Sequence, residues 1–251
     1  MRILVTNDDG IGAKGLQVLA EALRELGDVT IVAPAVERSA TGHAITLYDP
    51  LRVEKFYIGD KFFGHSVNGT PADCVKIAVK AIMEEPPDMV FSGINPGTNI
   101  GTNAIYSGTV SAAIEGSIMG ITSLAISTTA NENPNYDYAA DIALKLARKI
   151  LENQLPPDLL LNVNIPNLPP DQIKGMAITR QSKSKYREYF EKRVDPQKRE
   201  YYWLTGEMLN VESGEDVDYT VIKNGYISIT PLQYDLTNYH IKEQLKHWEF
   251  A

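Results

Sequence analysis

Cysteine and histidine are scarce in this chain, which has one Cys and four His among 251 residues. Because Cys74 is the single cysteine, no disulfide can form within the chain, and a cysteine-rich zinc site is excluded. We expect Cys74 to be a small apolar residue of the core.

Excess positive charge and long hydrophobic runs are also missing. The formal net charge is −8, which argues against a general nucleic-acid-binding protein because such proteins need a basic surface. No stretch has the roughly 20 apolar residues of a membrane span, and the amino terminus turns polar too soon for a secretion signal. The sequence therefore predicts a soluble, cytoplasmic protein with neither a nucleic-acid polymer nor a membrane as partner.

Strands and helices alternate through the first two thirds of the chain. Residues 3–5 and 29–33 are short apolar runs typical of buried strands, and residues 16–26 between them carry apolar side chains at helical spacing. A strand, helix and strand of this length form a βαβ unit with parallel strands. Further strands are expected at 89–91, 124–126 and 159–163, and further helices at 70–82, 107–118 and 142–151. We predict an α/β fold: a three-layer, Rossmann-like, doubly wound and mostly parallel sheet that forms a catalytic core over residues 1–165.

Two segments depart from this alternation. Residues 44–67 predict a hairpin-like excursion of short strands, including one at 45–48. Residues 166–251 predict a smaller C-terminal extension with a basic, aromatic hairpin projecting at about 183–204, a strand–turn–strand over 221–229 and a terminal helix over 241–248. We expect the projecting hairpin to pack on a partner subunit.

Two adjacent carboxylates follow the first predicted strand. Asn7-Asp8-Asp9-Gly10 lies at the edge where open α/β sheets bind their ligands. The same residue types form ordinary turns, which is the simpler interpretation of these four residues alone. On a turn the two carboxylates can converge, and a divalent cation would relieve their repulsion.

Further oxygen donors follow the neighbouring strands. Ser39 lies in the loop after the second strand, and Asn95 lies in a Gly- and Asn-rich loop after the strand at 89–91. The carboxyl ends of parallel strands share one edge, so these side chains are expected to converge with Asp8 and Asp9. Carboxylate, hydroxyl and amide oxygens suit Mg²⁺ or Mn²⁺ and do not suit zinc or copper.

A candidate phosphate site opens the helix at 107–118. The backbone N–H groups of Ser107, Gly108 and Thr109 would face outward at the positive end of the helix dipole, and two hydroxyls add donors. A plain N-cap serine is the simpler alternative, and a neighbouring metal site favours phosphate.

Two other phosphate chemistries fit less well. Gly10, Gly12 and Gly15 match the dinucleotide pattern G-x-G-x-x-G, but the carboxylates before them would repel a pyrophosphate, and no acid directly follows the second strand. An aspartyl-phosphate phosphatase needs Asp-x-Asp, and Gly10 stands where its second Asp would be.

Five motifs occur in order along the chain: Asn7-Asp8-Asp9-Gly10, Arg38-Ser39-Ala40-Thr41-Gly42, Asn68-Gly69-Thr70-Pro71-Ala72-Asp73, Ser92-Gly93-Ile94-Asn95-x-Gly97-x-Asn99 and Tyr106-Ser107-Gly108-Thr109-Val110. Together they resemble the SurE family, the stationary-phase survival proteins. The resemblance spans essentially the whole chain and is densest up to about residue 130.

The resemblance implies a metal-dependent phosphatase that acts on nucleoside 5′- and 3′-monophosphates, and in some members on polyphosphate, with one Mg²⁺ or Mn²⁺ per subunit. It implies that the metal ligands are Asp8, Asp9, Ser39 and Asn95, and that phosphate is held by Asn95, Ser107, Gly108 and Thr109. It also implies an exchange of the C-terminal portion between the subunits of a homodimer or homotetramer.

The roles in catalysis stay open at the level of the sequence. Asp8 or Asp9 would take the proton from the attacking water, and the sequence does not say which. His43, near Ser39, is a weaker acid–base candidate, since a lone loop histidine is usually a surface residue. The alternative function is a non-catalytic, nucleotide-binding regulator that uses the same pocket. The paired carboxylates favour the enzyme, because a sensor has little need for them.

Overall fold

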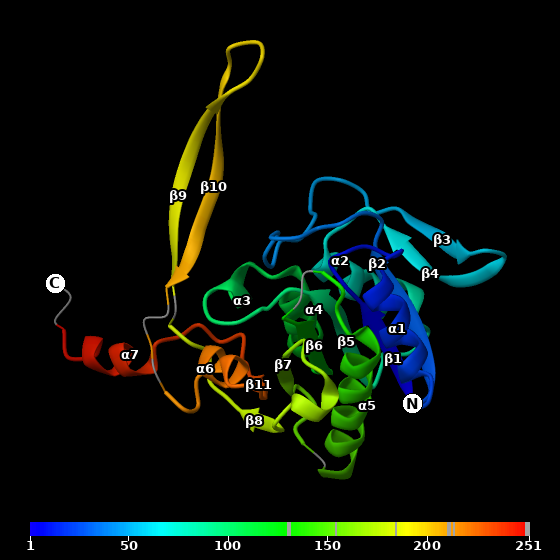
Figure 1. The fold of residues 1–251 in the computed structure, drawn as a ribbon. Coiled ribbons are helices and arrows are strands. Elements are labelled where there is room, and N and C mark those ends of the chain that lie inside the picture. The colour runs from blue at the N-terminus through cyan, green and yellow to red at the C-terminus, as the bar shows by residue number, and fades with distance from the viewer. Residues whose placement is uncertain (130–131, 154, 184, 210–211, 213, 249–251) are drawn as a thin grey trace.

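The computed structural model describes residues 1–129, 132–153, 155–183, 185–209, 212 and 214–248, and Figure 1 shows its fold. Within these residues a nine-stranded sheet forms the centre of the molecule. Its strands lie in the order β3 (Val53–Ile58), β4 (Lys61–Val67), β2 (Asp28–Pro34), β1 (Arg2–Thr6), β5 (Met89–Pro96), β6 (Thr122–Thr128), β7 (Leu160–Ile165), β11 (Ile227–Pro231) and β8 (Met176–Ile178).

The middle of this sheet is parallel. β2, β1, β5, β6 and β7 run side by side in the same direction. Ile3, Leu4 and Val5 of β1 are completely buried, as expected for a strand whose two faces are both covered. Thr6 at the end of β1 lies opposite Ser92 of β5 in a parallel pair, so the carboxyl ends of both strands point to the same edge, with β5 continuing beyond Ser92 to Pro96. The predicted doubly wound α/β fold is confirmed.

Helices cover both faces of the sheet and make three layers (Figure 1). α1 (Lys14–Leu23) packs against α5 (Tyr136–Asn153) on one face, and α2 (Pro71–Ile77), continued by a π-helical turn η1 (Ala78–Ile82), packs against α4 (Gly108–Ile118) on the other. The side chains of alternate residues in β1 point to opposite faces of the sheet and pack into the two cores. Ile3 and Val5 join the core beneath α1 and α5, and Leu4 joins the core beneath α2 and α4.

Local signals placed the start of α2 correctly. Thr70 accepts a hydrogen bond from the Asp73 backbone, and the Asp73 carboxylate accepts one from the Thr70 backbone, with Pro71 at the first helical position. Cys74 in this helix is completely buried, as predicted. Across the described residues, every helix is too short or too polar to span a lipid bilayer.

Three predicted boundaries in the core need correction. β5 continues to Pro96, so Asn95 lies at the end of a strand, opposite Ser127 of β6, and not in a loop. α5 begins at Tyr136 and not at the predicted residue 142. At this start, Asn135 Oδ1 accepts a hydrogen bond from the Tyr138 backbone. Residues 45–48 form no strand, because the Thr46 backbone N–H bonds instead to the Asp73 carboxylate.

The predicted excursion after β2 is a hairpin that returns to the sheet. β3 and β4 pair antiparallel, as expected, and β4 then pairs in parallel with β2. Gly64 allows this close pairing, because an added Cβ would lie 2.7 Å from the Ile31 carbonyl oxygen. The hairpin therefore extends the sheet at one edge.

The C-terminal part combines new strands with projecting elements. β9 (Lys185–Val194) and β10 (Glu200–Leu209) form the predicted hairpin, which stands away from the body in Figure 1. The prediction of a strand at the start of 221–229 is wrong, because these residues belong to the helix α6 (Asp218–Lys223). The helix ends before Gly225, whose φ of +82° suits glycine. The terminal helix is present as α7 (Tyr239–Leu245). β8 and β11 continue the main sheet beyond residue 165, so the division at that residue stays a prediction.

Candidate functional site

The loops that follow β1 and β2 are fastened to each other at the carboxyl edge of the sheet. The Ile11 backbone N–H donates to the Pro34 carbonyl at 2.8 Å, and the Arg38 backbone N–H donates to the Asp8 carbonyl at 2.7 Å. Ser39 is the next residue after Arg38. The structure thus brings the loop of Ser39 to the paired carboxylates, as the parallel topology requires.

Asp8 lies against the amino end of α4. Its side chain is almost fully buried, at 4% exposure, and its Oδ1 accepts a hydrogen bond from the Thr109 hydroxyl at 2.6 Å. Gly108 makes this approach possible, since an added Cβ would lie only 2.7 Å from the Asp8 Cβ. The short helix α3 (Asn103–Tyr106) leads into this segment, and Ser107 caps α4 by accepting a hydrogen bond from the Val110 backbone. Asp8, one of the predicted metal ligands, therefore lies against Gly108 and Thr109 of the predicted phosphate site.

Negative charge accumulates at this edge. Burial raises the pKa of the Asp8 carboxyl, and the hydrogen bond from Thr109 only partly offsets that effect. Burial, together with the charges of Asp8 and Glu37, raises the pKa of Asp9 to about 7. Burial and the nearby Asp9 charge also raise the pKa of the Tyr136 hydroxyl. Buried carboxyl groups whose pKa is raised by burial and by neighbouring negative charge favour a positively charged partner.

Ser39 and Asn95 are the other two predicted ligands, and they lie on neighbouring elements. The Ser39 hydroxyl donates to Glu37 Oε1 at 2.7 Å, so Glu37 connects this exposed serine to the charges of Asp8 and Asp9. The Asn95 amide nitrogen donates to the Gly97 carbonyl at 2.8 Å, and the amide oxygen is the atom that a cation would take. Sequence reasoning missed Glu37, although it stands two residues before Ser39.

Gly15 accounts for part of the dinucleotide-like glycine pattern. An added Cβ at Gly15 would lie 2.2 Å from the Ile94 carbonyl oxygen and 3.0 Å from the Tyr136 ring. Gly15 therefore allows α1 to lie directly on the end of β5, beside Asn95. Gly12, in contrast, has open space around it, with only the Phe56 ring 3.7 Å from an added Cβ. Close packing of a helix on a strand explains the third glycine without a bound cofactor.

The residues at this edge fit a hard divalent cation. Among the described residues no three His, Cys, Asp or Glu side chains are grouped to hold a metal ion, so a cation here would also need hydroxyl and amide oxygens. Those are the ligands that Mg²⁺ and Mn²⁺ accept. Asn7 Oδ1, just after β1, and Ser92 Oγ, in the part of β5 that lies opposite the end of β1, are buried without a hydrogen-bond partner in the described part of the protein. Oxygens of this kind are expected beside a polar ligand.

His43 has a structural partner. Its Nε2 lies 2.8 Å from Glu115 Oε2, and Lys76 Nζ lies 2.5 Å from Glu115 Oε1. Glu115 belongs to α4 and is 2% exposed. The three side chains join the loop that carries Ser39 to α2 and α4. Glu115 was missed at the level of the sequence, because its partners lie 39 and 72 residues away.

Removing the Glu115 charge is expected to destabilise the fold in a pH-dependent way. Burial alone would raise the pKa of Glu115, but the hydrogen bonds from His43 and Lys76 outweigh it and lower the pKa below its usual value. A lowered folded pKa gives stability that is present above the unfolded pKa and is lost as pH falls through the folded pKa. We expect Glu115→Gln to lower the free energy of unfolding by about 1–3 kcal/mol at pH 7 and by less near pH 4, measured by urea denaturation.

Glu25→Gln is the matched control for this measurement. Glu25 pairs with Arg148 at 2.7 Å, but both side chains are more than half exposed. Its loss should cost at most about 0.5 kcal/mol at either pH. An equal loss of stability in the two variants would contradict the structural role of Glu115.

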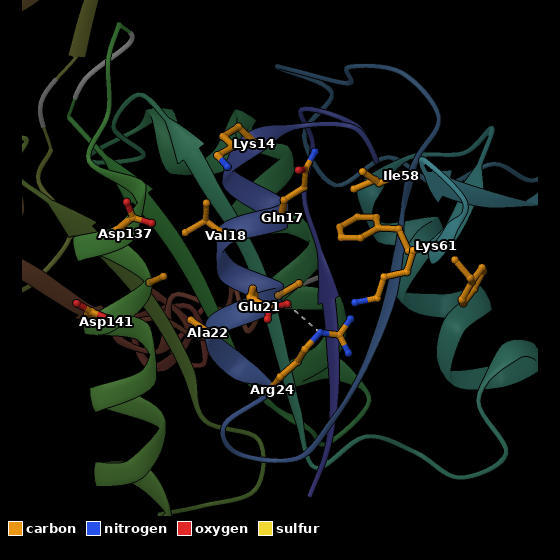
Figure 2. Close-up of a pocket in the computed structure, with 14 residues that line it drawn as sticks. Lys14, Gln17, Val18, Glu21, Ala22, Arg24, Ile58, Lys61, Asp137 and Asp141 are labelled. Carbon is orange, nitrogen blue, oxygen red and sulfur yellow. Dashed lines mark ion pairs between the residues drawn. The ribbon is translucent and has the colours of Figure 1, made fainter.

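A separate cleft of about 470 Å³ lies over the outer face of α1. Figure 2 shows Gln17 and Glu21 of α1, Asp137 and Asp141 of α5 and Lys61 of β4 around it. None of the predicted metal or phosphate residues lines this cleft. The charged edge at the ends of β1, β2 and β5 is therefore the candidate site.

The fold and the site define the class of this protein. It is a doubly wound α/β protein with an oxygen-rich, acidic site at the carboxyl ends of its parallel strands. The chain belongs to the SurE family: the family model described as "Survival protein SurE" matches residues 3–188.

Proteins similar to this chain cover it almost completely. A protein named 5′-nucleotidase SurE from Syntrophobacter fumaroxidans is 49% identical over 99% of both chains. One of the same name from Carboxydothermus hydrogenoformans is 51% identical over 99% of this chain and 96% of its own length. The crystal structure of the SurE protein from Aquifex aeolicus matches with a TM-score of 0.85 at 42% identity, covering 98% of this chain and 99% of that chain.

Proposed function

We propose that this protein is a metal-dependent phosphomonoester hydrolase that acts on nucleoside monophosphates, as a 5′-nucleotidase. Two kinds of observation support it. Relatives at about half identity over nearly their whole length carry that name. The observation that carries the proposal is the contact of Asp8, the first of two adjacent carboxylates after β1, with the amino end of α4, an arrangement that would place a cation beside a phosphate.

Asp8, Asp9, Ser39 and Asn95 would hold one divalent cation, Mg²⁺ or Mn²⁺, in each subunit. Their oxygens come from the ends of β1 and β5 and from the loop after β2, and the like charges of Asp8 and Asp9 favour a cation between them. When bound, the cation would neutralise charge on the phosphoryl group and lower the pKa of a coordinated water.

The start of α4 would bind the phosphate. The backbone N–H of Gly108 is left for a phosphate oxygen at the amino end of this 11-residue helix, because those of Thr109 and Val110 already donate to Asp8 and Ser107, and the helix dipole favours an anion there. Ser107 accepts from the Val110 backbone through its oxygen, which leaves the hydroxyl proton to donate to a phosphate oxygen. Asn95, at the end of β5, would contact the phosphate from the neighbouring strand.

Asp9 is the better placed of the two carboxylates to accept the proton from water. Asp8 is almost fully buried and its Oδ1 already accepts the Thr109 hydroxyl, whereas Asp9 is partly exposed. A general base must reach the water that it deprotonates. We therefore assign proton transfer to a carboxylate oxygen of Asp9, and orientation within the site to Asp8.

Release of inorganic phosphate from AMP tests this function. We expect turnover with Mn²⁺ or Mg²⁺ and none after addition of a chelator, with activity restored by excess metal. Parallel assays with 3′-AMP and polyphosphate define the substrate range. Binding of AMP without any phosphate release would contradict the hydrolase and support the alternative, a non-catalytic nucleotide-binding regulator.

We also propose that residues 166–251 join subunits into a homodimer or homotetramer. Phe190 and Leu204 lie directly opposite each other on the hairpin β9–β10, and both are more than half exposed. A two-stranded hairpin alone is at best marginally stable in water. None of the residues of α7 is buried within the subunit. Light scattering coupled to size-exclusion chromatography should give twice or four times the 27.8 kDa chain mass.

A further inference from the structure

The carboxylate of Asp8 is held by the first turn of α4. Thr109 Oγ1 donates to Asp8 Oδ1 at 2.6 Å, and Thr109 is 0% exposed. The Thr109 backbone also contributes a hydrogen bond to the same carboxylate. One residue on α4 therefore supplies two donors to Asp8, and both residues are buried.

This contact competes with a direct role of the Thr109 hydroxyl in phosphate binding. A hydroxyl has one proton to donate, and here the proton goes to Asp8. A phosphate oxygen at full charge needs donors and has none to offer in return. The Thr109 hydroxyl therefore cannot serve both groups at once, which leaves the Ser107 hydroxyl and the Gly108 backbone N–H to the phosphate.

The rest of the turn makes the position of Thr109 rigid. Ser107 caps the helix through the Val110 backbone, and the Ser111 hydroxyl donates back to the Ser107 carbonyl at 2.6 Å. Thr109 is β-branched, which restricts its side chain further. Gly108 leaves room for the carboxylate, whose Oδ2 would lie 3.0 Å from an added Cβ. A rigid donor fixes the orientation of the group that it contacts.

We propose that Thr109 is a positioning residue for Asp8, and that its hydroxyl sets the affinity for the divalent cation by fixing how the carboxylate is presented. The inference rests on the proposed function, because it needs a cation at Asp8. Outer-shell partners of metal ligands typically account for about 10–100-fold in metal affinity. The same hydroxyl does not contribute to the affinity for substrate.

Direct measurement of Mn²⁺ binding tests this role. The protein is titrated with Mn²⁺ in the absence of nucleotide, and the spectroscopic signal of the unbound Mn²⁺ gives the affinity. We expect Thr109→Val and Thr109→Ala to weaken Mn²⁺ binding about 10–100-fold, and Thr109→Ser to bind within a few-fold of the unaltered protein. At saturating Mn²⁺ the KM for AMP should stay within a few-fold in all three variants. Thr122→Val is the matched control: it removes another buried hydroxyl, which donates to the Pro157 carbonyl, and should leave Mn²⁺ binding unchanged.

The outcomes separate this inference from the function on which it rests. Unchanged Mn²⁺ affinity in Thr109→Val or Thr109→Ala, with a KM for AMP raised tenfold or more, would make Thr109 a phosphate ligand and overturn the proposal. The use of two variants without the hydroxyl keeps the test valid if one of them fails to fold. Asp8→Asn is the reference variant. If Asp8→Asn bound Mn²⁺ normally, the proposed cation site at Asp8 would be wrong. If Asp8→Asn lost Mn²⁺ binding but Thr109→Val bound Mn²⁺ normally, only the positioning role of Thr109 would be rejected.

Discussion

Asp8→Asn is expected to reduce metal-dependent phosphate release from AMP at least about a thousandfold. The change removes a negative charge from the proposed cation site but keeps the shape of the side chain and an oxygen that can accept from Thr109. A thousandfold loss corresponds to about 4 kcal/mol, which is the scale of charge stabilisation that a metal supplies to a phosphoryl group. Initial rates with AMP over a range of Mn²⁺ concentrations measure this effect.

The fold should survive this substitution. Asp8 is buried beside Asp9 and Glu37, whose charges repel it, so the neutral amide should be tolerated at least as well in metal-free protein. Thermal unfolding in chelator is expected to give an equal or higher Tm. Asp141→Asn, in the cleft over α1, is a control that should keep full activity. Normal turnover by Asp8→Asn, or lost turnover by Asp141→Asn, would show that the site has been misplaced.

Gly108→Ala is expected to have the second largest effect. Its Cβ would lie 2.7 Å from the Asp8 Cβ and 3.1 Å from the Pro71 Cγ, so either Asp8 or the start of α4 must move. Overpacking of this kind costs about 1–3 kcal/mol. We expect a lower Tm together with at least about a hundredfold loss of phosphate release, because a small displacement of a catalytic group has a large kinetic cost.

Gly12→Ala is the matched control for Gly108→Ala. It lies in the loop that carries Asp8 and Asp9, but an added Cβ would meet only the Phe56 ring, at 3.7 Å. Its Tm and its activity should both be close to those of the unaltered protein. If Gly108→Ala bound Mn²⁺ and released phosphate as Gly12→Ala does, the contact between Asp8 and α4 would have no functional importance.

Elements that depend on local sequence could be predicted. Residues 3–5 and 29–33 are apolar runs between turn residues, and they are the buried strands β1 and β2. Thr70, Pro71 and Asp73 carry a complete helix start within four residues, and the capping box is present. The convergence of Asp8 with the loop of Ser39 followed from the parallel topology alone.

Features that depend on distant partners could not be predicted in this way. The start of α6 is fixed by Asp218, which is completely buried and accepts from the Gly101 and Ser182 backbones, 117 and 36 residues away. A strand was predicted in part of this segment, since its apolar residues fit either structure. The bond between Thr109 and Asp8 spans 101 residues, and no local pattern marks it. Tertiary contacts of this kind decide local structure and the roles of side chains where the short-range signal is ambiguous.

A crystal soaked in Mn²⁺ tests the central claim most directly. The anomalous signal of manganese locates the ion independently of any assay. We predict one peak per subunit, within coordination distance of carboxylate oxygens of Asp8 and Asp9 and close to Ser39 and Asn95. A fully soaked crystal with no peak at the end of β1, or with its peak elsewhere in the subunit, would contradict the account.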